Sequence, residues 1–367
     1  MVERKKLSEL CSVHTGSQLN RDHMLDYGVY PVINGGKVAS GYTDSFNEDG
    51  ENITISQGGE SAGFVNWIET KFWAGAHCYV VVPFDIVSKR FLYHLLKNHE
   101  YHLQSSKQGA GIPGLNRKTL LNQELAIPSL PEQDRIVGVL DTFTASIENI
   151  KQQIEQRKKQ YEYYRDQLLN PEGKPETDVV PFGETCQMIK GNGVQKADFV
   201  ENGIGCIHYG QIYTHYGPFT YTTNRFVSKE VFDKARKASK GDIIMTDTSE
   251  NVEDICKSVA YLGDDDIAVS NHALIIKHKQ NPKFISYSTF TKNFFNQKRK
   301  YAFGVKVTGI RPEHLGRIMI YLPDLTEQNR IVAILDKFED SISNLEQQLE
   351  QRQKQYEYYR NKLLTFE

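Results

Sequence analysis

QYEYYR at residues 160–165 occurs a second time, unchanged, at residues 355–360. These six residues belong to a longer duplication, because a shift of 195 residues, from 160 to 355, aligns residues 127–169 with residues 322–364 and keeps most positions identical. Internal repeats determine architecture before any local feature does. The sequence therefore predicts two variable regions, each followed by one copy of a shared segment.

The shared segment has the composition and the periodicity of a long helix with one apolar seam. Leu, Ile, Glu, Gln, Lys and Arg dominate it, and apolar residues recur in alternating steps of four and three, which is typical of a coiled coil. A long isolated helix of this kind needs a partner, and the other copy is the obvious one. The predicted seam consists of Ile136, Leu140, Phe143, Ile147, Ile150, Ile154, Tyr161, Tyr164 and Leu168 in the first copy, and of Ile331, Leu335, Phe338, Ile342, Leu345, Leu349, Tyr356, Tyr359 and Leu363 in the second.

Two arginines in the seam favour antiparallel pairing. In a parallel pair in register, Arg157 would meet Arg352 in one buried layer, where two guanidinium groups repel and lose solvation. In an antiparallel pair, Arg157 would lie near Ile342 and Arg352 near Ile147, with each charged head in water. Tyr161 would then meet Phe338 and Tyr164 would meet Leu335. We expect the two variable domains at opposite ends of the helix pair, related by a pseudo-two-fold axis.

The two variable regions both mix strand-like runs with a late helix, which predicts an α+β fold. The copies also resemble each other weakly outside the helix, where GAGIPGLN (109–116) aligns with GVKVTGIR (304–311). The predicted strands lie at 29–35, 52–59, 63–75 and 78–84 and at 206–213, 241–248, 257–263 and 267–278, and the predicted helices at 88–103 and 282–301. The predicted boundaries are 1–130 for the first domain, 131–170 for the first spacer helix, 171–180 for a linker, 181–325 for the second domain and 326–367 for the second spacer helix.

Composition excludes several classes of protein. The chain has 367 residues, a formal charge of −2 and five scattered cysteines without a Cys-x-x-Cys pair, which fits a reducing cytoplasm better than a disulfide scaffold or a zinc ribbon. Its start is charged and has no apolar core of a secretory signal, and no apolar run is long enough to span a membrane. We therefore expect a cytoplasmic protein of two or more domains.

The duplicated layout resembles the specificity (S) subunit of type I restriction–modification enzymes. The resemblance rests on IPSLPEQDRIVGVLD (127–141) with KQYEYYRDQLL, on LPDLTEQNRIVAILD (322–336) with KQYEYYRNKLL, and on the variable runs YPVINGGKVASGYTD (30–44), ITISQGGESAGFV (53–65) and CIHYGQIYTHYG (206–217). Thr326 replaces the proline of the first copy, which is a small departure at a helix start.

The resemblance implies a non-catalytic protein that reads DNA. Each target-recognition domain would read one half of a bipartite, asymmetric site, and the paired helices would set the gap and dock two copies of the modification (adenine methyltransferase) subunit. A restriction (motor-nuclease) subunit would complete the complex. The chain itself would bind no cofactor, because S-adenosylmethionine, ATP and Mg would be bound by the partner subunits.

The sequence also lacks the motifs that a catalytic subunit would need. The chain contains no Asn-Pro-Pro-aromatic segment of an adenine methyltransferase and no phosphate loop of an ATP motor. IETK (68–71) supplies half of a nuclease-like metal site but lacks the acidic partner, and His94, His99 and His102 are better explained as a helix face than as metal ligands. We expect no metal site. A coiled-coil structural adaptor that does not read DNA remains the alternative.

Candidate DNA contacts are glycine-rich turns, short polar side chains near strand ends, and basic clusters. Backbone amides and Lys or Arg can bind phosphate, and polar side chains and histidine can bind base edges. The predicted DNA-binding residues are Asn34, Gly35, Lys37, Gln57, Gly58, Ser61 and Arg117 in the first domain, and His208, Tyr209, Tyr213, Thr246, Thr248, Ser249, Asn271, His272, Lys298, Arg299 and Lys306 in the second.

The heptad register also divides QYEYYR between two roles. Tyr161 and Tyr164 fall in the seam, whereas Tyr163 is predicted to point outward beside Arg165. Exposed aromatic residues with arginine are typical of protein interfaces. The predicted partner-binding residues are Tyr163, Arg165, Tyr358 and Arg360.

Overall fold

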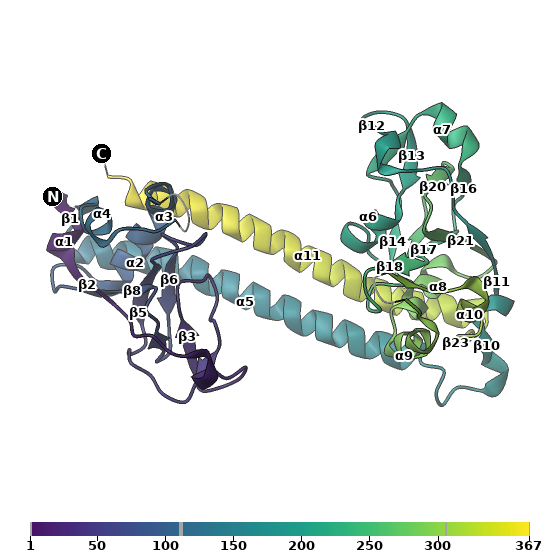
Figure 1. The fold of residues 1–367 in the computed structure, drawn as a ribbon, viewed down its shortest axis with the longest axis horizontal. Helices are drawn as coiled ribbons and strands as arrows, with labels where there is room; N and C mark the ends of the chain where they lie inside the picture. Colours follow the sequence, from purple (N-terminus) through teal and green to yellow (C-terminus); the bar gives the residue numbers. More distant parts are fainter. Residues whose placement is uncertain (1, 110–112, 305–306, 367) are drawn as a thin grey trace. The chain divides into compact units, whose positions relative to one another are not determined.

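The computed structural model describes residues 2–109, 113–304 and 307–366. The chain divides into two compact units: unit 1 comprises Met1–Gln152 with Gln347–Glu367, and unit 2 comprises Gln153–Glu346. Two long helices, α5 (Leu130–Leu169) and α11 (Leu325–Leu364), contribute residues to both units (Figure 1). The two long helices that the duplication predicts are thus confirmed.

Unit 1 is built on a four-stranded antiparallel sheet and a smaller three-stranded sheet. Its elements before α5 are β1 (Glu3–Lys6), α1 (Leu7–Leu10), β2 (Cys11–Thr15), η1 (Arg21–His23), β3 (Tyr30–Ile33), β4 (Tyr42–Thr43), β5 (Asn52–Ser56), β6 (Val65–Ile68), β7 (Trp73–Ala74), β8 (Cys78–Pro83), α2 (Lys89–Asn98), α3 (Glu100–Ser105), α4 (Arg117–Leu121) and β9 (Glu124–Ile127). The strand orders are β2-β8-β5-β6 and β4-β3-β7. The apolar face of α2 packs on the larger sheet, so that Phe91, Leu92 and Leu95 share one core with Ile53 and Ile55 of β5.

Unit 2 contains two five-stranded sheets. Its elements are η2 (Glu176–Asp178), β10 (Val179–Pro181), η3 (Phe182–Glu184), β11 (Cys186–Lys190), η4 (Lys196–Asp198), β12 (Phe199–Val200), β13 (Ile204–Ile207), α6 (Tyr209–Thr214), β14 (Phe219–Thr220), β15 (Arg225–Val227), α7 (Lys229–Lys234), β16 (Arg236–Ala238), β17 (Ile243–Thr246), β18 (Thr248–Ser249), β19 (Ser258–Tyr261), β20 (Ile267–Val269), β21 (Ala273–His278), α8 (Pro282–Thr289), α9 (Lys292–Tyr301), β22 (Thr308–Gly309), α10 (Pro312–Leu315) and β23 (Met319–Tyr321). The strand orders are β11-β21-β17-β19-β14 and β12-β15-β13-β20-β16.

The two units repeat one strand pairing although their sequences have diverged. In unit 1, β8 pairs antiparallel with β2 and β5, and in unit 2, β21 pairs antiparallel with β11 and β17. The parallel pair β3–β7 likewise has its counterpart in β13–β20. The α+β class that the sequence predicts for both domains is therefore confirmed, and the duplication extends through the sheets.

The structure corrects several secondary-structure predictions. The runs predicted at 63–75 and 241–248 are each two strands, which belong to different sheets. The strand predicted at 206–213 ends at Ile207, because His208 caps α6: its Nδ1 accepts from Gly210 N at 3.2 Å and its own N–H donates to Gln211 Oε1 at 2.8 Å. Each predicted late helix is two helices. In unit 2 the break comes at Thr291, whose hydroxyl caps α9 by accepting from Phe294 N at 3.2 Å.

Contacts within unit 2 show that α5 and α11 are antiparallel. Lys158 forms an ion pair with Glu346 at 2.8 Å, and six residues later along α5, the ring of Tyr164 stacks at 5.5 Å on Phe338, which lies eight residues earlier along α11. The predicted approach of Tyr161 to Phe338 is confirmed at 6.3 Å. Tyr164 also stacks on Phe338, and its approach to Leu335 stays a prediction.

Each of the two seam arginines lies over an aromatic ring of the other long helix. The Arg157 guanidinium lies 5.9 Å from the ring centroid of Phe338, and the Arg352 guanidinium lies 5.7 Å from that of Phe143. A cation is attracted to an aromatic face, and the proximity of Arg157 to Ile342 and of Arg352 to Ile147 stays a prediction. All predicted seam residues are buried or half-buried except Tyr164 and Tyr359, which are 46% and 40% exposed.

Candidate nucleic-acid interface and partner surface

Each long helix is anchored to its unit by a buried glutamine. Gln133 Oε1 accepts from Ser88 N at 2.8 Å, and Gln328 Oε1 accepts from Asn281 N at 3.0 Å. Each Nε2 donates to the carbonyl five residues earlier. Both glutamines are fully buried with their polar atoms satisfied, and Ser88 and Asn281 are the N-caps of α2 and α8. The glutamine of the repeated Glu-Gln pair thus joins the start of a long helix to the start of a helix in the adjoining unit.

A second anchor lies two turns further along each helix. In unit 1, Asp141 accepts from Arg90 Nε at 2.8 Å and pairs with His94 Nε2 at 2.7 Å. Although burial opposes ionisation, the hydrogen bonds from these two partners lower the pKa of Asp141. Burial lowers the pKa of His94, which is fully buried, against the opposing effect of Asp141.

The same anchor in unit 2 uses different side chains. Asp336 accepts from Tyr287 OH at 2.7 Å and from Lys283 Nζ at 2.9 Å. Burial raises the pKa of Tyr287, and Asp336 raises it further, so the phenol keeps its proton. Because Asp336 is the counterpart of Asp141 in the repeat, we call each set of glutamine, aspartate and their α2 or α8 partners a helix joint.

One position at the end of a central strand is held in the same way in both units. In unit 1, Gln57 N donates to His77 O at 3.0 Å, and Gln57 O accepts from Leu115 N at 2.7 Å. In unit 2, Asp247 N donates to His272 O at 3.2 Å, and Asp247 O accepts from Ile310 N at 3.1 Å. The 195-residue shift that relates the helices also relates His77 to His272 and Leu115 to Ile310. Gln57 and Asp247 are therefore equivalent, and we call them the paired strand-end positions.

Several predicted DNA-binding residues of unit 1 gather at its strand-end position. Asn34 Oδ1 accepts from His77 N at 3.3 Å, and Gly35, at φ +90°, approaches the His77 carbonyl so closely that a Cβ would lie 2.8 Å from it. Gly58 forms a bridge with Gly114. His77 itself is exposed, and the sequence reading missed it. Its alignment with His272 under the 195-residue shift could have identified it from the sequence.

The other predicted residues of unit 1 are less close. Lys37 is exposed, with Nζ 5.9 Å from the Phe64 ring centroid, and Ser61 is half-buried in the turn after β5. Arg117 is exposed at the start of α4. No structural contact links these three side chains to His77 among the described residues.

In unit 2 an aromatic cluster lies beside the strand-end position. The Tyr209 ring lies 4.4 Å from His208 and 5.3 Å from His272, and Tyr213 OH donates to Thr248 O. Burial, followed by the charges of Lys196 and His272, lowers the pKa of His208, so its imidazole is neutral near pH 7. The structure thus unites five predicted residues, whose rings, hydroxyls and imidazoles can stack on bases or hydrogen-bond with base edges.

The remaining polar predictions of unit 2 have internal partners. Asn271 Oδ1 accepts from Gly193 N at 3.1 Å, and Ser249 Oγ accepts from Asn251 N at 3.3 Å. Thr246 is fully buried, and its hydroxyl donates to Lys257 O at 3.4 Å. These side chains support the loops around the aromatic cluster.

Of the predicted phosphate contacts in unit 2, Lys298 has an unfavourable geometry. It is only 4% exposed, and its Nζ donates to the carbonyls of Glu253 at 2.9 Å and Ile255 at 2.5 Å. Lys298 lies one turn after the buried Phe294, which places both on the inner face of α9. Arg299 is exposed, and Lys306 lies outside the described residues.

The predicted partner surface contains two exposed tyrosine pairs. Tyr163 is 61% exposed and meets Tyr164 edge to face at 5.4 Å, and Tyr358 is 60% exposed and meets Tyr359 at 5.3 Å. The arginines do not flank the outer tyrosines as predicted. Arg165 lies over the Tyr161 ring at 5.4 Å, and Arg360 lies over the Tyr356 ring at 5.3 Å, so both turn toward the seam. Each predicted partner surface therefore presents a tyrosine pair, and Lys362 Nζ lies 5.8 Å from the Tyr358 ring centroid.

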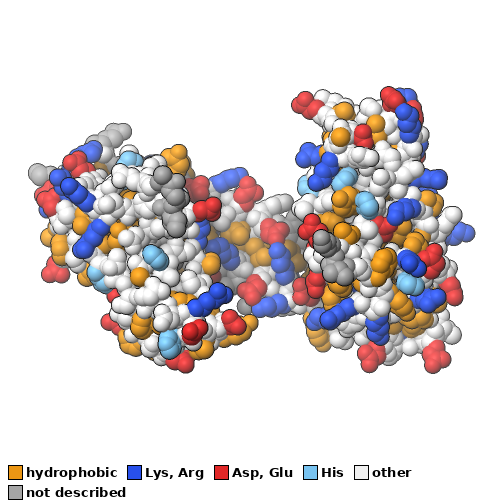
Figure 2. All heavy atoms as spheres, in the orientation of Figure 1, with side chains coloured by type: hydrophobic (Ala, Val, Ile, Leu, Met, Phe, Trp, Pro, Cys, Tyr) orange, Lys and Arg blue, Asp and Glu red, His pale blue; other side chains and the backbone are white. Residues whose placement is uncertain are grey.

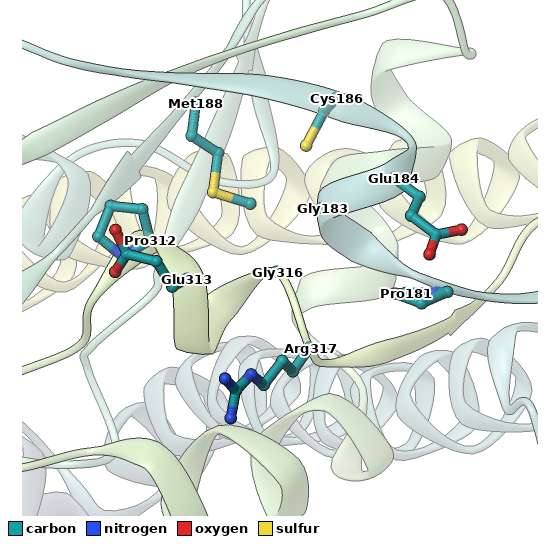
Figure 3. A pocket seen from close by; sticks show the side chains of 9 residues that line it. All are labelled: Pro181, Gly183, Glu184, Cys186, Met188, Pro312, Glu313, Gly316 and Arg317. Carbon is teal, nitrogen blue, oxygen red and sulfur yellow. The ribbon is translucent and has the colours of Figure 1, made fainter.

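The hollow shown in Figure 3 is not part of either cluster. It encloses about 590 Å³ in unit 2 between η3, the start of β11 and α10, and its lining includes Cys186, Met188 and Pro312. Gly183 and Gly316 let the two backbones approach closely there. Burial raises the pKa of the Cys186 thiol to about 11, so the cysteine is not an activated nucleophile.

Metal and membrane features are absent from the residues that the structure describes. No group of three or more His, Cys, Asp or Glu side chains in the described ranges could hold a metal ion. In the same part of the chain, no helix has both the length and the apolarity needed to cross a bilayer.

Comparison with known proteins decides the family. Residues 1–157 and 177–353 match the model of the family described as the type I restriction modification DNA specificity domain. The chain belongs to this family. Two matched segments agree with the duplicated units, and membership makes DNA recognition within a type I restriction–modification system the role of this specificity subunit.

Curated relatives and solved structures carry similar descriptions. A putative type I restriction enzyme specificity subunit of Haemophilus influenzae is 27% identical, with 100% of this chain and 96% of the relative covered. The type I restriction enzyme EcoR124I/EcoR124II specificity subunit of Escherichia coli is 32% identical over 65% of this chain and 60% of the relative. The crystal structure of the type I S subunit from M. genitalium has a TM-score of 0.64 at 18% identity, covering 100% of this chain and 97% of that one. A structure described with assembly of the type I R-M system has a TM-score of 0.60 at 16% identity, with coverages of 99% and 97%.

Proposed function

We propose that this specificity subunit reads a bipartite, asymmetric DNA site, with unit 1 and unit 2 each reading one half. The observation that carries the proposal is the pair of strand-end positions. Both are held by the same backbone hydrogen bonds, but the side chains beside them differ, because Asn34 lies against His77 in unit 1 and the Tyr209 ring lies against His272 in unit 2. Two domains that read different DNA sequences require the same backbone arrangement with different side chains.

The long helices have two further roles in this proposal. They set the gap between the half-sites, and their two exposed tyrosine pairs dock two copies of the modification subunit. A restriction subunit joins the complex. The chain has no catalytic residue and binds no cofactor of its own, and S-adenosylmethionine, ATP and Mg belong to the partner subunits. Double-stranded DNA is the remaining partner.

Methylation mapping tests the proposal. The chain would be expressed with its modification subunit in a host without other methyltransferases, and modified adenines would be mapped across the genome. We expect one motif of two different half-sequences separated by a fixed gap. A continuous palindrome, or no motif in a host in which the complex is shown to assemble, would contradict the proposal and favour the structural adaptor.

A further inference from the structure

A second pocket of unit 2 lies beside the aromatic cluster. It encloses about 590 Å³, and its lining includes Lys196, Phe199, His208 and Arg225. His208 is shared with the aromatic cluster, where it contacts Tyr209. On the face of unit 2 seen in Figure 2, Lys or Arg and His side chains gather near α6. The pocket therefore adjoins the surface that we propose reads bases.

Two cations enter this pocket from ordered elements. Lys196 begins η4, and Arg225 begins β15, where it pairs across the sheet with Cys206, two residues before His208. The Arg225 guanidinium lies 5.9 Å from the ring centroid of Phe199. Lys196 is close enough to His208 for its charge to lower the histidine pKa. Both charges thus face the same wall of the pocket.

Neither cation has an ion-pair partner among the described residues, whereas other cations of unit 2 do. Lys234 pairs with Glu230 at 2.7 Å, Lys240 pairs with Asp264 at 2.7 Å, and the Lys298 ammonium is bound by two buried carbonyls. Glu201 is the carboxylate that lines the pocket, so two positive charges oppose one negative charge. Lys234, Lys240 and Lys298 are thus engaged, whereas Lys196 and Arg225, which line one pocket, have no ion-pair partner in the described part of the chain.

We infer that Lys196 and Arg225 form a phosphate-binding site for the DNA backbone beside the bases that the aromatic cluster faces. The inference rests on the proposed function and deepens it. Base contacts specify a sequence, but contacts to phosphate set the register and the orientation of the protein on the duplex. The Arg225 guanidinium suits bidentate contact with a phosphate, and the mobile Lys196 ammonium suits a point contact.

Salt dependence of DNA binding tests this site. The complex of the full chain with its modification subunit would be titrated with a duplex that carries the mapped motif and with a scrambled duplex, at several KCl concentrations. For Lys196→Gln with Arg225→Gln, we expect the slope of log Kobs against log [KCl] to become shallower by about 1.8, because each lost phosphate contact removes about 0.9. The same change is expected on both duplexes, and the methylated motif should stay the same.

A matched control removes the same charge elsewhere in unit 2. Lys229 and Lys234 are exposed on α7 and pair with Asp233 and Glu230. Lys229→Gln with Lys234→Gln should leave the slope unchanged. An equal reduction in the control would overturn the site, as would an unchanged slope in the Lys196/Arg225 variant.

Two further outcomes separate this site from its rivals. If the variant alters the second half of the motif, the residues read bases and the phosphate assignment is wrong. If it weakens subunit assembly without changing either slope, the pocket binds an acidic protein surface instead. If the wild-type complex shows no sequence preference, the proposed function is refuted. Even then, a shallower slope of the variant on scrambled DNA would support the phosphate site.

Discussion

His94 and Tyr287 perform the same task in the two units: each reaches from a recognition-unit helix to the equivalent aspartate of a long helix. His94 Nε2 lies 2.7 Å from Asp141 Oδ1, and Tyr287 OH donates to Asp336 Oδ1 at 2.7 Å. Both are fully buried. The joints therefore have equal geometry and unequal chemistry, since only the imidazole titrates near neutral pH.

This difference predicts that acid weakens the helix joint of unit 1 before that of unit 2. Burial lowers the pKa of His94, so as the pH falls the unfolded chain binds a proton before the folded chain does. The contribution of His94 is complete above about pH 6.5 and declines as the pH falls below that value. Asp141 and Tyr356 face the ring from the long helices, and Arg90 and Arg360 add charges that lower the histidine pKa.

Hydrogen exchange of the full chain between about pH 7.5 and pH 5.5 measures this effect, once rates are corrected for intrinsic pH dependence. Protection of α2 should decrease toward acid while that of α8 stays level. His94→Tyr copies the unit 2 joint and should remove most of the difference. Equal pH dependence of α2 in the wild type and in His94→Tyr would refute the role of His94.

Removal of a joint glutamine should lower the free energy of unfolding. Gln328→Ala would leave Asn281 N and a buried carbonyl without partners, and unsatisfied buried groups cost about 1–3 kcal/mol each. We expect unit 2 to be destabilised by roughly 2 kcal/mol or more in chemical denaturation. Gln167→Ala, at an exposed position of α5, is the control and should change little. Similar small losses in both variants would contradict the anchoring role.

The two strand-end histidines should act on separate half-sites. His77→Asn should alter or relax only one half of the methylated motif, and His272→Asn only the other, because each histidine belongs to one unit. Asparagine is chosen because it tolerates the positive φ of 64° at His272. Methylation mapping of each variant provides the measurement. A change of both halves by one substitution would mean that the units do not read independently.

The exposed tyrosines should matter for assembly and not for folding. Tyr163→Ala with Tyr358→Ala removes the outer ring of each pair, and interface aromatics of this kind commonly contribute about 1–2 kcal/mol or more. We therefore expect binding of the modification subunit to weaken by roughly tenfold or more, with unchanged helix content by circular dichroism. Tyr101→Ala removes a ring that is 85% exposed on unit 1 and serves as the control. Assembly measured by sedimentation at wild-type affinity would refute the docking role.

The sequence predicted the features that repeat with short or fixed spacing. The heptad pattern predicted the helices, Arg157 and Arg352 predicted antiparallel pairing, and the glycine-rich and histidine-containing turns pointed to the strand ends. The stacking of Tyr164 on Phe338 was not predicted, because a large ring reaches beyond its own helical layer. Lys298 was misjudged as part of a basic run, although its spacing from Phe294 places it on the inner face of a helix.

The joints escaped sequence reading for a different reason. Arg90 and His94 lie one helical turn apart on α2, but Asp141 follows His94 by 47 residues and forms no local motif with either of them. Only the fold brings them together. Lys196 and Arg225 were missed likewise, since each is a single cation in a mixed segment and their common pocket depends on the pairing of β15 with β13.

The helix joints have a consequence for how such a protein can change. The long helices supply the constant half of each joint, a glutamine and an aspartate, while α2 or α8 supplies the variable half. Each recognition unit therefore supplies its own side chains to bind the same glutamine and aspartate of a long helix. Replacing one unit by a foreign one would bring a different target sequence together with the side chains that hold it, and no compensating substitution in the helices would be needed.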